Sequence, residues 1–221
     1  MSDYTPNQSL ENLRQDYRLD QLDEADLAAS PIQQFKAWFE EAEACEHILE
    51  PNAMTLATAS AEGIPSARIV LLKGLDEEGF RFYTNYQSAK GQMIAENPYV
   101  SLVFFWVALQ RQVRIDGTAF RLSEAESTAY FQKRPKGSQV GAWVSPQSQV
   151  IPSREALEHN AEQLEQTFAQ QEVLPKPINW GGYVVKPYQI EFWQGRSSRL
   201  HDRLRYRLTE EYTWELERLA P

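Results

Sequence analysis

Apolar residues recur at helical spacing near the start of the chain and at strand spacing over most of the remaining sequence. Ile32, Phe35 and Trp38 are three positions apart, as on the buried face of a helix. Ser30 and Pro31 precede them in the order of an N-cap and a first helical residue. Alternating or continuous apolar runs then predict strands at 53–59, 66–75, 80–85, 99–109 and 111–122.

Further helices are predicted from their capping residues and from proline. A short helix is expected over 88–97, before Pro98, and Ser123 and Glu126 have capping-box spacing in a helix that stops at Pro135. An amphipathic surface helix is expected over 153–171, and strand-like runs at 180–195 and 203–221 suggest a closing hairpin. This order predicts a mainly β (α+β) protein, an antiparallel β-barrel with peripheral helices.

Composition indicates a soluble cytoplasmic protein. The chain has 221 residues, of which 42% are hydrophobic, and no apolar run reaches the about eighteen residues of a membrane span. The N-terminal segment has no apolar signal-peptide core. A single cysteine, Cys45, allows no internal disulfide, as expected in a reducing compartment.

The acidic charge is concentrated in the first third of the chain. Residues 1–62 carry 13 acidic and 3 basic side chains, and the rest carry 18 acidic and 19 basic. Local basic clusters after residue 62 can therefore dominate their surroundings. With a pI near 5.0 the chain lacks the broad basic face of a nucleic-acid binder, so small anions are the expected partners.

Common catalytic motifs are absent from the sequence. It contains no dinucleotide-binding glycine motif, no Walker-type phosphate loop, no nucleophile elbow and no zinc-protease motif. The three histidines, His47, His159 and His201, are scattered, so no metal site is expected. Because no nucleophile–base pair is evident either, the chemistry is expected to need a cofactor.

Several fragments have the composition of anion sites. Ser88 and Lys90 begin a helix, where free N–H groups favour phosphate, and Arg68 and Lys73 flank an apolar strand. Each fragment also has an ordinary explanation, an N-cap or a pair of strand-end charges. Strict alternation puts Arg68 and Lys73 on opposite faces, so one ligand meets both only across a twist or a bulge.

Three more fragments extend this set, and the whole set predicts an anionic cofactor and an anionic substrate. Tyr130 and Arg134 share a helical face, with Ser138 after the break at Pro135. Gln147 and Ser148 lie in a polar loop, and residues 192–207 are rich in arginine. Taken singly, these three fragments are typical of a helix-end charge, a surface turn and a protected edge hairpin, respectively.

Taken together, the segments "RIVLLK", "FYTNYQSAKG", "RPKGSQVGAWVSPQS", "FWQGRSSRLHDR" and "RLAP" closely resemble those of the pyridoxine/pyridoxamine 5′-phosphate oxidase family, from about Leu13 to Pro221. The resemblance implies an FMN-binding split barrel, an antiparallel Greek-key barrel that forms a homodimer with FMN at the subunit interface. It also implies the oxidation of pyridoxamine or pyridoxine 5′-phosphate to pyridoxal 5′-phosphate, with dioxygen reduced to hydrogen peroxide.

The resemblance assigns residues to two ligands. It implies FMN contacts, some of them from the partner subunit, by Arg68, Ile69, Val70, Leu71, Leu72, Lys73, Tyr83, Thr84, Lys90, Gln112, Gln147, Ser148, Trp193 and Arg203. It implies substrate contacts by Lys73, Tyr130, Arg134, Ser138, Arg199, Leu200 and His201, with Arg14 and Tyr17 in a lid. Arg199 and His201 would be the catalytic pair. His201 would either shuttle a proton or hold a structural hydrogen bond, and both alternatives stay open.

The resemblance also suggests a division of the chain. Residues 1–30 are expected to be a mobile arm and lid, 31–174 the FMN-binding barrel, and 175–221 a strand pair that completes the site and the dimer interface. The family usually has arginine where this chain has Ala89, and this predicts weaker FMN retention. Alternative functions are another split-barrel flavin oxidase, such as a phenazine-pathway enzyme, and a non-enzymatic pyridoxal phosphate carrier.

Overall fold

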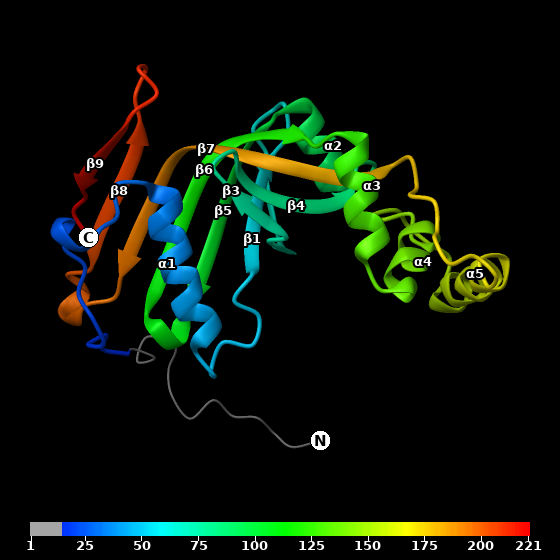
Figure 1. Cartoon of the computed structure of the whole chain (residues 1–221), viewed down its shortest axis with the longest axis horizontal. Coiled ribbons are helices and arrows are strands. Elements are labelled where there is room, and N and C mark those ends of the chain that lie inside the picture. The colour runs from blue at the N-terminus through cyan, green and yellow to red at the C-terminus, as the bar shows by residue number, and fades with distance from the viewer. Residues whose placement is uncertain (1–14) are drawn as a thin grey trace.

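The structure is a computed structural model that describes residues 15–221, and it consists of a curled β-sheet with helices around it (Figure 1). The α-helices are α1 (Pro31–Ala44), α2 (Ala89–Glu96), α3 (Glu124–Lys133), α4 (Lys136–Val144) and α5 (Arg154–Thr167). The strands are β1 (Ala53–Ala59), β2 (Pro65–Leu71), β3 (Gly74–Asp76), β4 (Gly79–Asn85), β5 (Tyr99–Trp106), β6 (Arg111–Arg121), β7 (Trp180–Gln194), β8 (Asp202–Leu208) and β9 (Trp214–Arg218). Short 3₁₀ turns are η2 (Glu24–Asp26), η3 (Val107–Leu109) and η4 (Ser197–Arg199).

All strand pairs are antiparallel, and the long strand β7 pairs with three neighbours, β4, β6 and β8. The order is β2-β1-β5-β6-β7-β4-β3, with β8 paired to β7 and β9 paired to β8. The first half of β7 pairs with β4 and the second half with β8, while β6 follows it on the other side. The register with β6 shifts between Asp116 and Gly117, opposite Pro187, and such a bulge bends a strand. The bend lies between the part of β7 that pairs with β4 and the part that pairs with β8.

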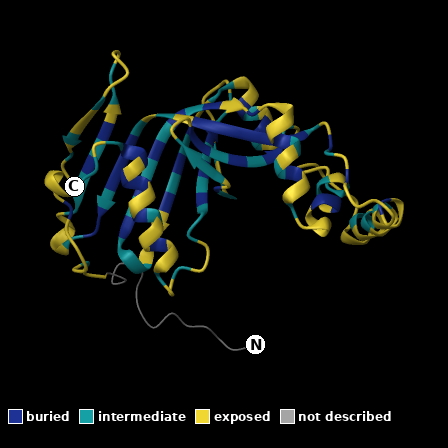
Figure 2. Cartoon of the chain, viewed as in Figure 1, coloured by how far each residue is buried: buried dark blue, intermediate teal, exposed yellow. Residues whose placement is uncertain are grey.

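The main core lies between α1 and the curled sheet. Phe35 of α1 is fully buried and contacts Phe80 and Phe104 edge to face, with ring centroids 4.9 and 5.0 Å apart. A second, smaller core lies under α3 and α4, where Phe131 packs on Trp180 of β7. Helix α5 has no buried residue, and its residues are exposed or half-buried (Figure 2).

The predicted fold class is confirmed, and the expected helices form with their expected caps. Ser30 accepts a hydrogen bond from the amide of Gln33, and Ser123 and Glu126 form the capping box. The predicted hairpin is present as β7 and β8, but the run 203–221 forms two strands rather than one. Helix α4 was not expected from the sequence. None of the helices within residues 15–221 is long and apolar enough to cross a membrane.

Candidate active site

A cavity of about 500 Å³ brings together most of the predicted anion-binding fragments. Strands β2, β4 and β7 and helices α2, α3 and α4 supply its walls. The predicted residues that line it are Arg68, Ile69, Val70, Leu71, Lys73, Tyr83, Thr84, Lys90, Tyr130, Arg134, Ser138 and Gln147. Fragments that are each unremarkable in the sequence therefore share one concave site.

Arg68 and Lys73 both line this cavity although strict alternation puts them on opposite faces. The reason is that β2 ends at Leu71, so the alternation stops before Lys73. The chain then turns, Leu72 enters the core, and the amide of Lys73 donates to the carbonyl of Arg81. The strict alternation therefore ends at Leu71, and this turn brings both side chains to one cavity.

Lys90 and Arg68 are cations held in place by neutral groups. The Nζ atom of Lys90 lies 3.1 Å from Oε1 of Gln147 and 3.3 Å from Oγ1 of Thr84. The guanidinium of Arg68 donates to the Leu56 carbonyl and to hydroxyl oxygens. Burial, and then the charge of Arg68, lower the pKa of Lys90, and burial lowers the pKa of Arg68. An anion between them would relieve both effects.

Arg134 lies beside a stack of aromatic rings on another wall of the cavity. Tyr83 and Tyr130 stack with centroids 3.8 Å apart, and the guanidinium of Arg134 lies 4.8 Å from the Trp180 ring. Its Nη1 atom is buried and has no hydrogen-bond partner among the described residues. Burial lowers the pKa of Arg134 and raises the pKa of Tyr130. A buried cationic donor without a partner is the expected state of a site for an anionic ligand.

The cavity cations differ from the arginines near the C-terminus in their partners. Within residues 15–221, none of Arg68, Lys73, Lys90 and Arg134 has a carboxylate within ion-pair distance. The arginines that do pair with carboxylates near the C-terminus are Arg196, Arg203, Arg205, Arg207 and Arg218. The arginine-rich segment is therefore largely neutralised, whereas the cations of the cavity have no carboxylate partner among the described residues.

The remaining predicted residues form a second group around β6, β7 and β8. Gln112, Trp193 and Arg203 are directly opposite one another across these strands, so their side chains share a face. Arg203 makes two hydrogen bonds to the buried carboxylate of Glu191, at 2.8 and 3.1 Å. Because Glu191 is buried and the pair is bidentate, the direction of the Arg203 side chain is fixed.

Tyr17 and His201 pack against Trp193 in this second group. The His201 ring lies 4.6 Å from Trp193, and the Tyr17 ring 5.9 Å from it. The η4 turn ends at Arg199 and is followed by Leu200, and both residues are exposed. Strands β8 and β9 and helices α3 to α5 lie at opposite ends of the molecule in Figure 1. One chain thus presents two separate groups of predicted site residues.

Three predicted residues belong to neither group. Leu72 is buried in the main core, and Ser148 lies in an exposed turn with φ 71°. Arg14 lies outside the described residues. Residues that line the cavity without having been predicted are Asn85, Gly141, Ala142, Ser145 and Trp180. Gly141 and Ala142 lie in α4, and Ser145 is its C-cap. The helical spacing of the apolar residues Val140, Trp143 and Val144 could have predicted this helix.

Comparison with known proteins gives matches over most of the chain. Residues 40–168 match a family model described as pyridoxamine 5′-phosphate oxidase, and residues 180–221 match one described as the pyridoxine 5′-phosphate oxidase C-terminal dimerisation region. The pyridoxine/pyridoxamine 5′-phosphate oxidase of Salinibacter ruber is 56% identical over 96% of this chain and 99% of its own. That of Acaryochloris marina is 55% identical over the full length of both chains.

A solved structure supports the same placement. PhzG from Burkholderia lata, in complex with tetrahydrophenazine-1-carboxylic acid, superposes with a TM-score of 0.85 at 32% identity. The match covers 92% of this chain and 99% of PhzG. The chain has the split-barrel fold, a cation-lined cavity and relatives that match it from end to end. It therefore belongs to the pyridoxine/pyridoxamine 5′-phosphate oxidase family.

Proposed function

We propose that this protein oxidises pyridoxamine 5′-phosphate and pyridoxine 5′-phosphate to pyridoxal 5′-phosphate, with FMN as cofactor and dioxygen as the final acceptor. The observation that carries the proposal is the cavity in which Arg68, Lys90 and Arg134 lie without carboxylate partners among the described residues. A phosphorylated cofactor and a phosphorylated substrate supply the anions that these residues lack. The identity of more than half to oxidases of this name supports the same function.

The residues of the cavity suit the binding of FMN. Lys90 at the start of α2, together with Arg68, would meet its phosphate, and Gln147 and Thr84 would hold Lys90 in position. The backbone of 69–71, which forms a cavity wall, would lie along the cofactor. When bound, FMN supplies the hydride acceptor of the reaction, which dioxygen then reoxidises.

Phosphate recognition also explains a preference for the phosphorylated vitamers. Arg134, Tyr130, Ser138 and Lys73 would bind the phosphate of the substrate at the same cavity. Arg134 is held over Trp180, so its guanidinium is oriented before the substrate arrives. Because charge-assisted hydrogen bonds are stronger than neutral ones, most of the binding energy is expected at this end of the substrate.

The second group would complete the site from another copy of the chain. Residues 180–221, which match a dimerisation region, contain Trp193, Arg199, His201 and Arg203. We place these residues over the cavity of a partner subunit, with Arg199 and His201 facing the reacting ring. Arg199 would orient the substrate and favour negative charge that develops on it.

The spectrum of the purified protein tests the proposed function. A yellow preparation whose flavin absorbance is bleached by anaerobic pyridoxamine 5′-phosphate, and restored by air, supports the oxidase. A preparation that stays inactive with added FMN contradicts it, and a colourless protein that binds pyridoxal 5′-phosphate would be a carrier. Bleaching by a reduced phenazine precursor, but not by pyridoxamine 5′-phosphate, would indicate the phenazine-type alternative.

The first prediction concerns Arg134. Arg134→Gln should lower kcat/KM for pyridoxamine 5′-phosphate by about 10- to 150-fold, because a charge-assisted hydrogen bond worth roughly 1.5–3 kcal/mol is lost. The loss should be in KM rather than in flavin content. Lys133→Gln removes the same charge from an exposed neighbour and should leave both parameters unchanged. Equal losses in the two variants would mean that Arg134 does not bind the phosphate.

The second prediction concerns Ala89, which is exposed at the start of α2. Ala89→Arg should lower the Kd for FMN by about 10-fold or more, because it restores a charged donor next to Lys90. Fluorescence titration of the apoprotein with FMN measures this. Ala95→Arg, at an exposed alanine further along the same helix, is the control. An equal decrease in the Kd for FMN in both variants would mean that added positive charge acts without regard to position.

The third prediction separates turnover from cofactor binding. Arg199→Ala should lower kcat by roughly 10²–10³-fold, as when an electrostatic donor to the transition state is removed, while the flavin content stays at the wild-type level. Arg207→Ala removes an exposed arginine that pairs with Glu215, and it should change neither value. Loss of flavin from the Arg199 variant would assign Arg199 to the cofactor instead.

A further inference from the structure

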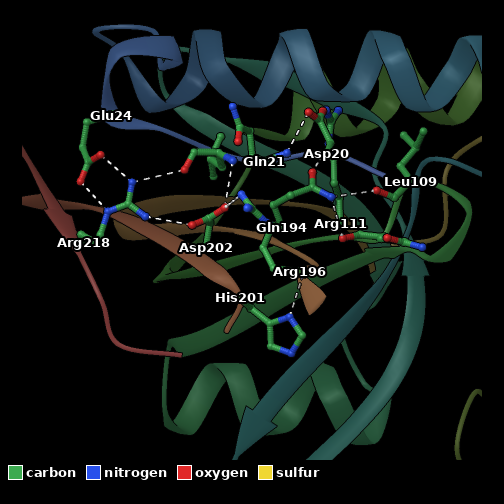
Figure 3. Close-up of polar contacts among 12 residues, drawn as sticks. Asp20, Gln21, Glu24, Leu109, Arg111, Gln194, Arg196, His201, Asp202 and Arg218 are labelled. Atoms are coloured by element: carbon green, nitrogen blue, oxygen red, sulfur yellow. Dashed lines mark hydrogen bonds and ion pairs between the residues drawn. The ribbon is translucent and has the colours of Figure 1, made fainter. Parts of the chain in front are cut away.

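The ring of His201 is held by a backbone amide. The N–H of Arg196 donates to Nδ1 of His201 at 3.0 Å. A ring nitrogen that accepts a hydrogen bond carries no proton, so the neutral imidazole has its proton on Nε2. Figure 3 shows Nδ1 facing the polar network and the opposite edge of the ring pointing away from it.

The Arg196 side chain is anchored in turn by Asp202. Its Nη1 atom lies 3.0 Å from Oδ2 of Asp202, which also accepts from the amide of Leu22 at 3.1 Å. The other carboxylate oxygen accepts from Nη1 of Arg218 at 3.0 Å, and Arg218 pairs with Glu24 (Figure 3). The Asp202 side chain is 17% exposed, so this carboxylate is a largely buried anchor with hydrogen bonds to both oxygens.

The Arg196–Asp202 pair closes a strained turn that contains His201. Between the two residues, Ser198 and Arg199 have φ values of 57° and 62°, in the left-handed region that non-glycine residues avoid. Such a conformation persists only where surrounding contacts hold it. The ion pair joins the two ends of the turn, and it thereby fixes both the Arg196 amide and the exposed Arg199.

The groups that face His201 favour the neutral ring. Tyr17 from the N-terminal segment and Trp193 from β7 pack on it, with centroids at 6.0 and 4.6 Å. The nearby charges are Arg199 in the turn and Asp202 on β8. Burial, and then Arg199, lower the pKa of His201, whereas Asp202 raises it. Gly195 permits this packing, since a Cβ there would lie 2.6 Å from the Tyr17 ring.

We propose that Arg196 and Asp202 are positioning residues that hold His201 as the Nε2–H tautomer, so that it donates a hydrogen bond to an acceptor atom of the substrate. This inference rests on the proposed function for the identity of the substrate. The ring cannot take up a proton at Nδ1 without losing the Arg196 amide, and Nε2 already carries one. Nδ1 of His201 thus keeps the structural hydrogen bond with the Arg196 amide, and Nε2–H is the donor to the substrate, so His201 is not the proton shuttle.

The tautomer is measured by long-range proton–nitrogen correlation spectra of the full-length holoprotein with isotope-labelled histidine. The chain has three histidines, and His201→Gln assigns the signal. We expect the wild type to show the Nε2–H pattern at neutral pH, with a midpoint of titration below the ordinary value of about 6.5. An Nδ1–H pattern, or an imidazolium at neutral pH, would overturn the proposal whether or not the protein is an oxidase.

Arg196→Gln tests the anchor, because it keeps the amide and removes the ion pair. We expect averaged tautomer signals, a higher midpoint of titration and a fall of about 2- to 12-fold in kcat/KM. Arg196→Lys, which keeps the ion pair, should restore all three. Arg205→Gln breaks the pair of a β8 arginine with Glu217 and should match the wild type in the His201 signals. An Arg196→Gln spectrum identical to the wild type would exclude the anchoring role.

Discussion

The cavity brings several cationic side chains together without a carboxylate partner among the described residues, and the proposed function depends on this arrangement. Charged groups removed from water destabilise a protein unless opposite charge or hydrogen bonds compensate them. Arg68 and Lys90 are held by neutral oxygens, and Arg134 keeps a buried donor that has no partner within residues 15–221. The arginines of β8 and β9, in contrast, are paired with glutamate or aspartate. Under the proposed function, phosphorylated ligands bound in the cavity would supply the negative charge that these cations lack.

Strand β7 joins the cavity to the second group of residues. Its first half pairs with β4 next to the cavity and contributes Trp180, and its second half pairs with β8 and carries Trp193. Because Trp180 and Trp193 lie near the two ends of this 15-residue strand, the two groups are held apart within one chain. Under the proposed function, the aromatic and basic residues of one copy complete the cavity of another, so dimer formation and catalysis depend on the same strand.

Much of this arrangement could be predicted from local sequence, and the rest depended on tertiary contacts. Caps and periodicity predicted α1, α2 and α3 because short-range hydrogen bonds and burial determine them. Helix α4 was missed because Gly137 and Gly141 lower helix propensity and Pro135 suggests a break. Arg68 and Lys73 meet at the cavity only because β2 ends early, and the pairing of Arg203 with Glu191 depends on the register of β7 and β8. Neither could be inferred from spacing along the chain.

The measurement that tests the central claim most directly is the activity of a mixed dimer. One subunit would carry Arg134→Gln and the other Arg199→Ala, each with its own affinity tag, so that only mixed dimers are purified. If each site combines the cavity of one copy with the turn of the other, one of the two sites is intact and activity returns to about half of the wild-type value. A mixed dimer as inactive as its two parents would contradict a site shared between chains.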